Sequence, residues 1–123
     1  DWKVLDFAQP EIRGDREVML KALEQSVYPL RFASKEITQD KEVMLGAVRR
    51  SAAALRYASP ELLKDRDIIR EAALQDYTTM QSASAEVRSD RELILEIVTR
   101  RGEALQYASQ SLRADREVVL RAV

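Results

Sequence analysis

The stretch Asp90-Arg91-Glu92-Leu93-Ile94-Leu95 is one of five related copies along the chain, and this repetition decides the fold. The other copies begin at Asp15, Asp40, Asp65 and Asp115, so successive copies start 25 residues apart without an insertion or deletion. A fixed period of this length is typical of repeat proteins, in which each unit packs on its neighbours. The spacing therefore predicts an all-α fold, a short α-solenoid of about five 25-residue helix-turn-helix repeats.

The copies divide the chain into four complete units and two partial ones, which we interpret as one helical-repeat domain. The complete units are 15–39, 40–64, 65–89 and 90–114. Residues 1–14 match the second half of a unit, and residues 115–123 match the beginning of one. Because both partial units stop in mid-pattern, we expect a longer native repeat array, or partner chains that cover the open ends.

Composition narrows the class of protein. In 123 residues, 46% are hydrophobic and 33% charged, with three Gly and three Pro, which is typical of a soluble, folded, helical chain. The formal net charge of -1 argues against a nucleic-acid partner. There is no Cys and no His, which removes thiolate and imidazole chemistry.

No apolar run approaches the roughly 18 residues that a transmembrane helix needs, and no targeting segment is visible. The sequence begins at Asp1 instead of Met, which indicates a processed or trimmed N-terminus. The compartment of the protein therefore stays open.

Each copy carries the signals of a helix start. The aspartate that opens it can accept hydrogen bonds from the free N–H groups of the first turn, so we predict five structural helix caps. Apolar residues follow at i, i+1, i+4 and i+5, as in Leu93, Ile94, Ile97 and Val98, and form one stripe. The pattern predicts first helices near 16–25, 41–50, 66–75, 91–100 and 116–123.

A shorter second helix and a further helical turn, which we expect to be 3₁₀, complete each unit. The turn before the second helix of the last complete unit contains Gly102, which fits a helix C′ position. The further turn begins at a serine in most units, and in one of them Ser59-Pro60-Glu61 is a helix-start signal. Its buried residue is predicted to be Ile12, Ile37, Leu62, Val87 or Leu112.

The segments from Ala104 to Ser109 and from Leu112 to Val123 resemble the repeat catalogued as domain of unknown function 4116, and the resemblance covers essentially the whole chain. It implies a helical repeat found in tandem arrays, notably in algal and other microbial proteins, with no established catalytic motif. One unit departs from the pattern, since Arg70 replaces a recurring Leu and Ser82 a recurring aromatic residue. We therefore expect the layer at 65–89 to bury less apolar area.

Neighbouring carboxylates such as Asp65 with Asp67, or Asp90 with Glu92, can be read as metal or acid–base pairs. Because the same block recurs in every unit, helix capping explains all copies at once. A catalytic group is expected only once in a chain. The sequence therefore predicts no catalytic residue, no metal site, no cofactor and no enzyme activity.

Basic residues occur in two settings. A row at one repeat position consists of Arg16, Lys41, Arg66, Arg91 and Arg116. It either binds anions or pairs with the neighbouring acidic row, which we favour because the acids lie next to the bases throughout. Arg49 and Arg50, like Arg100 and Arg101, form either a patch for a phosphate or an acidic partner or a favourable charge at a helix C-terminus.

Trp2 and Tyr77 share a repeat position with Val27, Ala52 and Gly102. Such variation is unusual for a core position, so the two aromatic residues are candidate exposed anchors for a partner. The alternative is that each fills a gap in its own layer, and the sequence does not separate the two.

The function favoured by these features is a non-enzymatic helical-repeat scaffold, which mediates protein–protein interaction or is a structural subunit of a larger assembly. The candidate partner-binding residues are Trp2, Tyr77, Arg49, Arg50, Arg100 and Arg101. The main alternative is an anion- or nucleic-acid-binding module that uses the paired arginines, with a salt-sensitive affinity. A third alternative is a targeting or regulatory segment of a larger enzyme.

Overall fold

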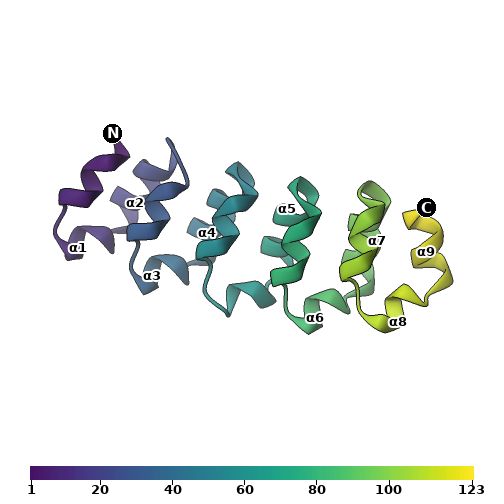
Figure 1. Cartoon of the computed structure of the whole chain (residues 1–123). Helices are drawn as coiled ribbons and strands as arrows, with labels where there is room; N and C mark the ends of the chain where they lie inside the picture. The colour runs from purple at the N-terminus through teal and green to yellow at the C-terminus, as the bar shows by residue number, and fades with distance from the viewer. The chain divides into compact units, whose positions relative to one another are not determined.

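The computed structural model describes residues 1–123 and consists of helices and their connections, without a strand. The chain divides into two compact units, Asp1–Leu62 and Leu63–Val123, which are described separately. The predicted all-α repeat fold is confirmed (Figure 1).

Unit Asp1–Leu62 contains η1 (Trp2–Phe7), α1 (Pro10–Arg13), α2 (Arg16–Leu23), η2 (Tyr28–Phe32), α3 (Lys35–Thr38), α4 (Lys41–Arg50) and η3 (Ala52–Tyr57). After η4 (Leu62–Lys64), unit Leu63–Val123 contains α5 (Arg66–Gln75), η5 (Tyr77–Ser82), α6 (Ala85–Arg88), α7 (Arg91–Arg100), η6 (Gly102–Tyr107), α8 (Gln110–Arg113) and α9 (Arg116–Ala122).

The first helix of each repeat begins directly after its aspartate. In all five copies a carboxylate oxygen accepts a hydrogen bond from the N–H three residues later, as between Asp15 and Val18 at 3.1 Å. Helices α4, α5 and α7 have the predicted bounds, whereas α2 ends at Leu23. The aspartates therefore fix where the first helices start.

Replacing Asp15 with alanine should lower the free energy of unfolding by about 1 kcal/mol, because the Val18 N–H loses its acceptor. Asp15→Asn should retain most of this stability, since the amide oxygen can accept the same hydrogen bond. Urea denaturation of the three proteins measures the difference. An equal loss in both variants would show that the carboxylate charge matters more than the cap.

The second segment of each repeat is a 3₁₀ helix, and the further turn is a single turn of α-helix in four of five repeats. The expected helix types are therefore interchanged. In four repeats, a side chain just before the 3₁₀ segment accepts a hydrogen bond from the N–H two residues later. The donor and acceptor residues are Lys3 and Asp1, Tyr28 and Ser26, Ala53 and Ser51, and Thr78 and Asp76. Such a short-range bond favours a tight start to the segment.

The core follows the i, i+1, i+4, i+5 stripe of the first helices. In α7, Leu93, Ile94, Ile97 and Val98 are essentially inaccessible to solvent. The position after Ile94 differs, because Leu95 is half-buried and its counterpart Leu20 is 38% exposed. The recurring leucine therefore lies at the edge of the core in each repeat.

This edge position shows how the replacement of a leucine by Arg70 affects the layer at 65–89. Arg70 replaces a leucine that is never fully buried, whereas Ile68 and Ile69 beside it have no exposed surface. The missing aromatic residue at Ser82 is offset locally, since Tyr77 packs on Tyr107 with ring centroids 6.3 Å apart. The core of α5 is therefore fully buried, and the smaller apolar area expected for this layer stays a prediction.

Neighbouring repeats within each unit also share one backbone hydrogen bond each. In the first unit, the N–H groups of Ser34 and Ser59 donate to the carbonyl oxygens of Arg13 and Thr38. In the second unit, those of Ser84 and Ser109 donate to Leu63 and Arg88, at 3.1 and 3.0 Å. Of the predicted buried residues of the further turn, only Ile12 differs, with 41% exposure. Ile12 belongs to α1, the first such turn of the unit.

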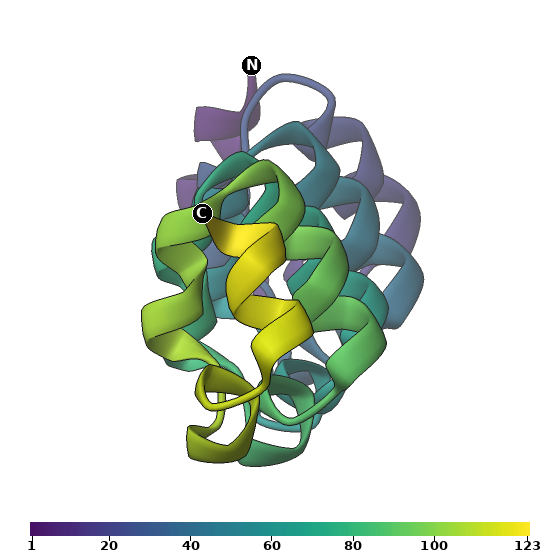
Figure 2. The ribbon, with the colours of Figure 1, turned by 90° about the vertical axis from the view of Figure 1, so that its right-hand side faces the viewer.

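Gly102 has a role that the sequence did not predict. No residue has a positive φ, so Gly102 is not a left-handed helix C′ residue. A Cβ added to Gly102 would lie 2.1 Å from the carbonyl oxygen of Ala122. Figure 2 shows α9 lying between η6 and α7, both of which it contacts. The absent side chain is therefore what permits α9 to approach η6.

Candidate functional site

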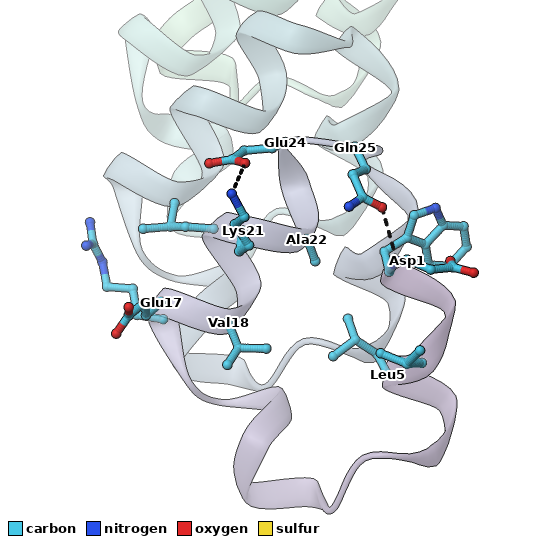
Figure 3. A pocket seen from close by; sticks show the side chains of 12 residues that line it. Asp1, Leu5, Glu17, Val18, Lys21, Ala22, Glu24 and Gln25 are labelled. Atoms are coloured by element: carbon cyan, nitrogen blue, oxygen red, sulfur yellow. Dashed lines mark hydrogen bonds and ion pairs between the residues drawn. The ribbon is translucent and has the colours of Figure 1, made fainter.

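A groove of about 750 Å³ lies between η1 and α2 in the first unit (Figure 3). Leu5 from η1 and Val18 from α2 point toward each other across it. Its lining is mostly apolar, and charged side chains of α2 stand at its rim. The residues that line it are Asp1, Trp2, Val4, Leu5, Arg16, Glu17, Val18, Leu20, Lys21, Ala22, Glu24 and Gln25.

The repeat explains why this groove exists. In the second unit, α7 packs against both η6 and α9. The repeat counterparts of η6 and α9 in the first unit are η1 and α2. Within Asp1–Leu62 no α-helix packs against both η1 and α2 as α7 packs against η6 and α9. The groove is therefore shaped like the seat of a first helix.

Burial along α2 shows that its outer face lacks a neighbour. Val18 is partly exposed, whereas its counterparts Val43 and Val118 have no exposed surface. In η1, Val4 is 61% and Phe7 89% exposed. The repeat position of Val18 is thus accessible here although it is buried in the other repeats, and exposed apolar surface of this kind is typical of an interaction surface.

Trp2 forms part of the groove wall and is half-buried. Its ring lies 6.3 Å from that of Tyr28, centroid to centroid, and its backbone N–H donates to Oε1 of Gln25 at 3.2 Å. The structure thus places Trp2 in the candidate site and gives it a packing contact as well. Tyr77 lies in the other unit and is half-buried against Tyr107.

Some of the charged residues at the rim of the groove form ion pairs and others do not. Lys21 pairs with Glu24 at 2.9 Å, and Arg16 reaches away from the groove to Asp40 and Glu42 at 2.9 and 2.5 Å. The hydrogen bond with Asp40 raises the pKa of Arg16. Burial opposes ionisation of Asp40, but the bonds from Arg16 and from the Val43 N–H leave its pKa below the ordinary value. The acids at the cap and first-turn positions of α2 are Asp15 and Glu17, and neither forms an ion pair.

The same contact recurs along the basic row. In the second unit Arg66 pairs with Asp90 at 3.3 Å, and Arg91 pairs with Asp115 at 3.1 Å and with Glu117 at 2.5 Å. The hydrogen bond from Arg91 holds the pKa of Asp115 below its ordinary value. Each of these arginines therefore bridges to the cap and first-turn acid of the next repeat, as the pairing interpretation predicts.

The paired arginines lie at helix ends. Arg49 and Arg50 close α4, Arg100 closes α7, and Arg101 follows it; all four are exposed. The two pairs belong to different units, and neither unit brings together three acidic, His or Cys side chains that could hold a metal ion. No helix has the length and apolar character needed to cross a membrane. The positive charge at these C-termini suits the helix dipole.

Arg70 forms an ion pair that the sequence pattern did not predict. Its guanidinium contacts both carboxylate oxygens of Glu96, at 2.8 and 2.5 Å, and Glu71 at 3.4 Å. The hydrogen bond from Arg70 is the main cause of a lowered pKa at Glu96. Only a three-dimensional pairing of α5 with α7 brings these positions together.

Arg70→Leu should raise the pKa of Glu96 toward the ordinary glutamate value of about 4.3. A carboxyl group whose pKa is lowered by folding stabilises the folded state above its unfolded pKa, and this contribution disappears as the pH falls through the folded pKa. The wild type should therefore lose more stability than the variant between about pH 5 and 3. NMR titration of Glu96 and urea denaturation at each pH measure both effects, with Arg113→Leu as the control. An unchanged Glu96 pKa in Arg70→Leu would contradict the pairing.

The groove residues other than Trp2 were not identified from the sequence as a site. Leu5 is a buried core residue and Leu20 has the edge position of the repeat, whereas Val18 has a core position that is partly exposed only in α2. The partial unit at 1–14 was the available signal, because it pairs η1 with α2 without a first helix of its own.

Comparison with known proteins agrees with the repeat. The family described as "Domain of unknown function (DUF4116)" matches residues 1–38, 40–88 and 90–123, which is nearly the whole chain. No curated protein and no solved structure matches it. The 25-residue period, the capped first helices and these three matches together show that the chain belongs to the DUF4116 family.

Proposed function

We propose that this chain is a non-enzymatic helical-repeat scaffold that binds another protein through the groove between η1 and α2. The observation that supports this function is the exposed apolar surface of Val4, Val18 and Leu20, positioned as the seat of a helix. A groove of this kind fits the apolar face of an amphipathic helix, with contacts at helical spacing. The half-buried Trp2 provides a rigid aromatic wall.

The abundant carboxylates support a structural module over an enzyme. The aspartates that open the repeats cap helices in all five copies, and several of them also bind an arginine of the preceding repeat. Each of these five aspartates therefore has the same capping role. A catalytic pair would need one copy with a different environment.

A photoreactive amino acid in place of Leu20 tests this function in an extract of the source cells. We expect covalent adducts with a polypeptide, and we expect Val18→Arg in the same protein to remove them by blocking the groove. A photoreactive residue at the exposed Arg56 is the matched control. Equal labelling at both positions, or adducts with nucleic acid that depend on Arg49 and Arg50, would overturn the proposal.

A further inference from the structure

A small hollow lies between α2 and α4, the first helices of the two complete repeats in the first unit. It has a volume of about 240 Å³ and a mostly apolar lining. Leu20 and Leu23 line it from α2, and Val43, Gly46 and Ala47 line it from α4. Leu20 and Gly46 are exposed, whereas the other three residues are buried. We call this feature the seam hollow.

Gly46 is the residue that leaves the seam hollow open. Its counterparts in the other copies are Lys21, Glu71, Glu96 and Arg121, which all have long charged side chains. A Cβ added to Gly46 would meet no atom within 4 Å, so no neighbouring atom requires a glycine here. Glycine inside a helix is destabilising relative to alanine. What Gly46 provides at this position is therefore the open space itself.

The matching place between α5 and α7 is closed. The counterparts of Leu20 and Gly46 there are Arg70 and Glu96, whose side chains form an ion pair with two contacts. Between α2 and α4, the same two positions hold an exposed aliphatic side chain and no side chain at all. An exposed aliphatic residue beside an open space is suited to receive an apolar side chain from another molecule.

Two charged residues, Glu24 and Arg50, complete the lining of the seam hollow. Glu24 is paired with Lys21 at 2.9 Å, whereas Arg50 is exposed and forms no ion pair. Arg49, which precedes it in α4, is exposed as well. The cation at the hollow is therefore available, and a carboxylate on the ligand would complement it.

The size of the seam hollow indicates what kind of ligand fits. Pockets for drug-sized molecules and cofactors usually enclose about 300–1,000 Å³. The seam hollow is smaller than this range, at about 240 Å³. Its volume suits a single aliphatic side chain that is presented by a larger molecule, as at the anchor positions of protein interfaces.

We propose that the seam hollow binds an acidic segment of a partner protein, which inserts one aliphatic side chain and places a neighbouring carboxylate on Arg50. This site goes beyond the groove between η1 and α2. The two features share Leu20 and Glu24, but Gly46 and Arg50 line the seam hollow alone. Each site can therefore be blocked without the other.

NMR titration of residues 1–123 with the peptide acetyl-Glu-Leu-Glu-amide tests the ligand chemistry. We expect shifts of the Gly46 and Arg50 amides that saturate at millimolar peptide, because one apolar contact and one exposed ion pair give little affinity. Acetyl-Lys-Leu-Lys-amide and acetyl-Glu-Ser-Glu-amide should each bind about tenfold more weakly, since one lacks the carboxylates and the other the aliphatic group. Equal binding of the three peptides would refute the proposal. Isocaproate binding as tightly as the first peptide would indicate a free small acid in place of a protein segment.

Substitutions locate the site. Gly46→Glu fills the hollow with the side chain type of Glu96 and should weaken binding of acetyl-Glu-Leu-Glu-amide by about tenfold, through steric exclusion and charge repulsion. This variant should still fold, because glutamate favours a helix more than glycine does. Arg50→Gln should weaken binding by about threefold, with Arg56→Gln as the unchanged control. Val18→Arg blocks the groove between η1 and α2 and should leave peptide binding unaltered. Full binding in Gly46→Glu, or loss in Val18→Arg alone, would reject the seam hollow and leave the proposed groove standing.

Discussion

Ile94→Ala should lower the free energy of unfolding by about 2–5 kcal/mol, the range for removing a large aliphatic side chain from a packed core. Ile94 has no exposed surface, and its counterparts Met19, Met44 and Ile69 are also fully buried. The substitution removes contacts with neighbouring layers, and solvent cannot fill the apolar cavity that it leaves.

Leu95→Ala is the matched control for this prediction, since Leu95 is the next residue of α7 and only half-buried. It should cost clearly less, at about 1 kcal/mol. Urea denaturation measures both losses of stability, and the slope of the unfolding transition is compared between the variants. Equal losses at the two positions would show that the recurring leucine belongs to the core, and that the stripe at 93, 94, 97 and 98 is misplaced.

Two glycine-to-alanine substitutions should change stability in opposite directions. Gly102→Ala should cost about 1–3 kcal/mol, because the new Cβ would lie 2.1 Å from the Ala122 carbonyl oxygen and the backbone must move. Gly46→Ala should gain about 0.5–1 kcal/mol, because Gly46 is an exposed residue inside α4 with no atom within 4 Å of an added Cβ.

The free energies of unfolding of the two glycine variants are measured by urea denaturation under the same conditions. Loss of stability in Gly102→Ala should be accompanied by faster exchange of the α9 amides, because the collision is with the end of that helix. Stabilisation of Gly102→Ala comparable to that of Gly46→Ala would contradict the close approach of α9 to η6.

Local signals made the first helices predictable. The aspartate cap and the apolar stripe depend on residues a few positions apart, so the ranges 41–50, 66–75 and 91–100 agree with α4, α5 and α7. All five caps accept the N–H three residues later, and Asp65 and Asp115 also accept the N–H two residues later. The 3₁₀ character of the second segments was missed because apolar spacing over six residues does not separate two helix types.

Features that depend on contacts between repeats were less predictable. The recurring leucine at the position of Leu20 and Leu95 looks like a core residue in the sequence. Periodicity shows which face of a helix is buried, but not how deeply the residues at the edge of that face are buried. Arg70 therefore suggested a weak layer, although its partner Glu96 lies on the next first helix. The approach of Ala122 to Gly102 likewise joins distant positions, and the sequence showed only a turn glycine.

The candidate site was partly visible in the sequence. Trp2 was identified as a possible anchor because of its variable repeat position, and it lines the groove. Tyr77 was identified for the same reason, yet it packs on Tyr107. Val18 was missed because its exposure depends on which helices pack beside α2, which is a property of the assembled layers. Leu20 was missed because its repeat position looks like a core position in the sequence.

Amide hydrogen exchange of residues 1–123 tests most directly whether the repeats are equivalent layers. The amides of α4, α5 and α7 should exchange slowly and equally, because their core residues are buried alike. Fast exchange in α5 beside slow exchange in α4 and α7 would contradict the account.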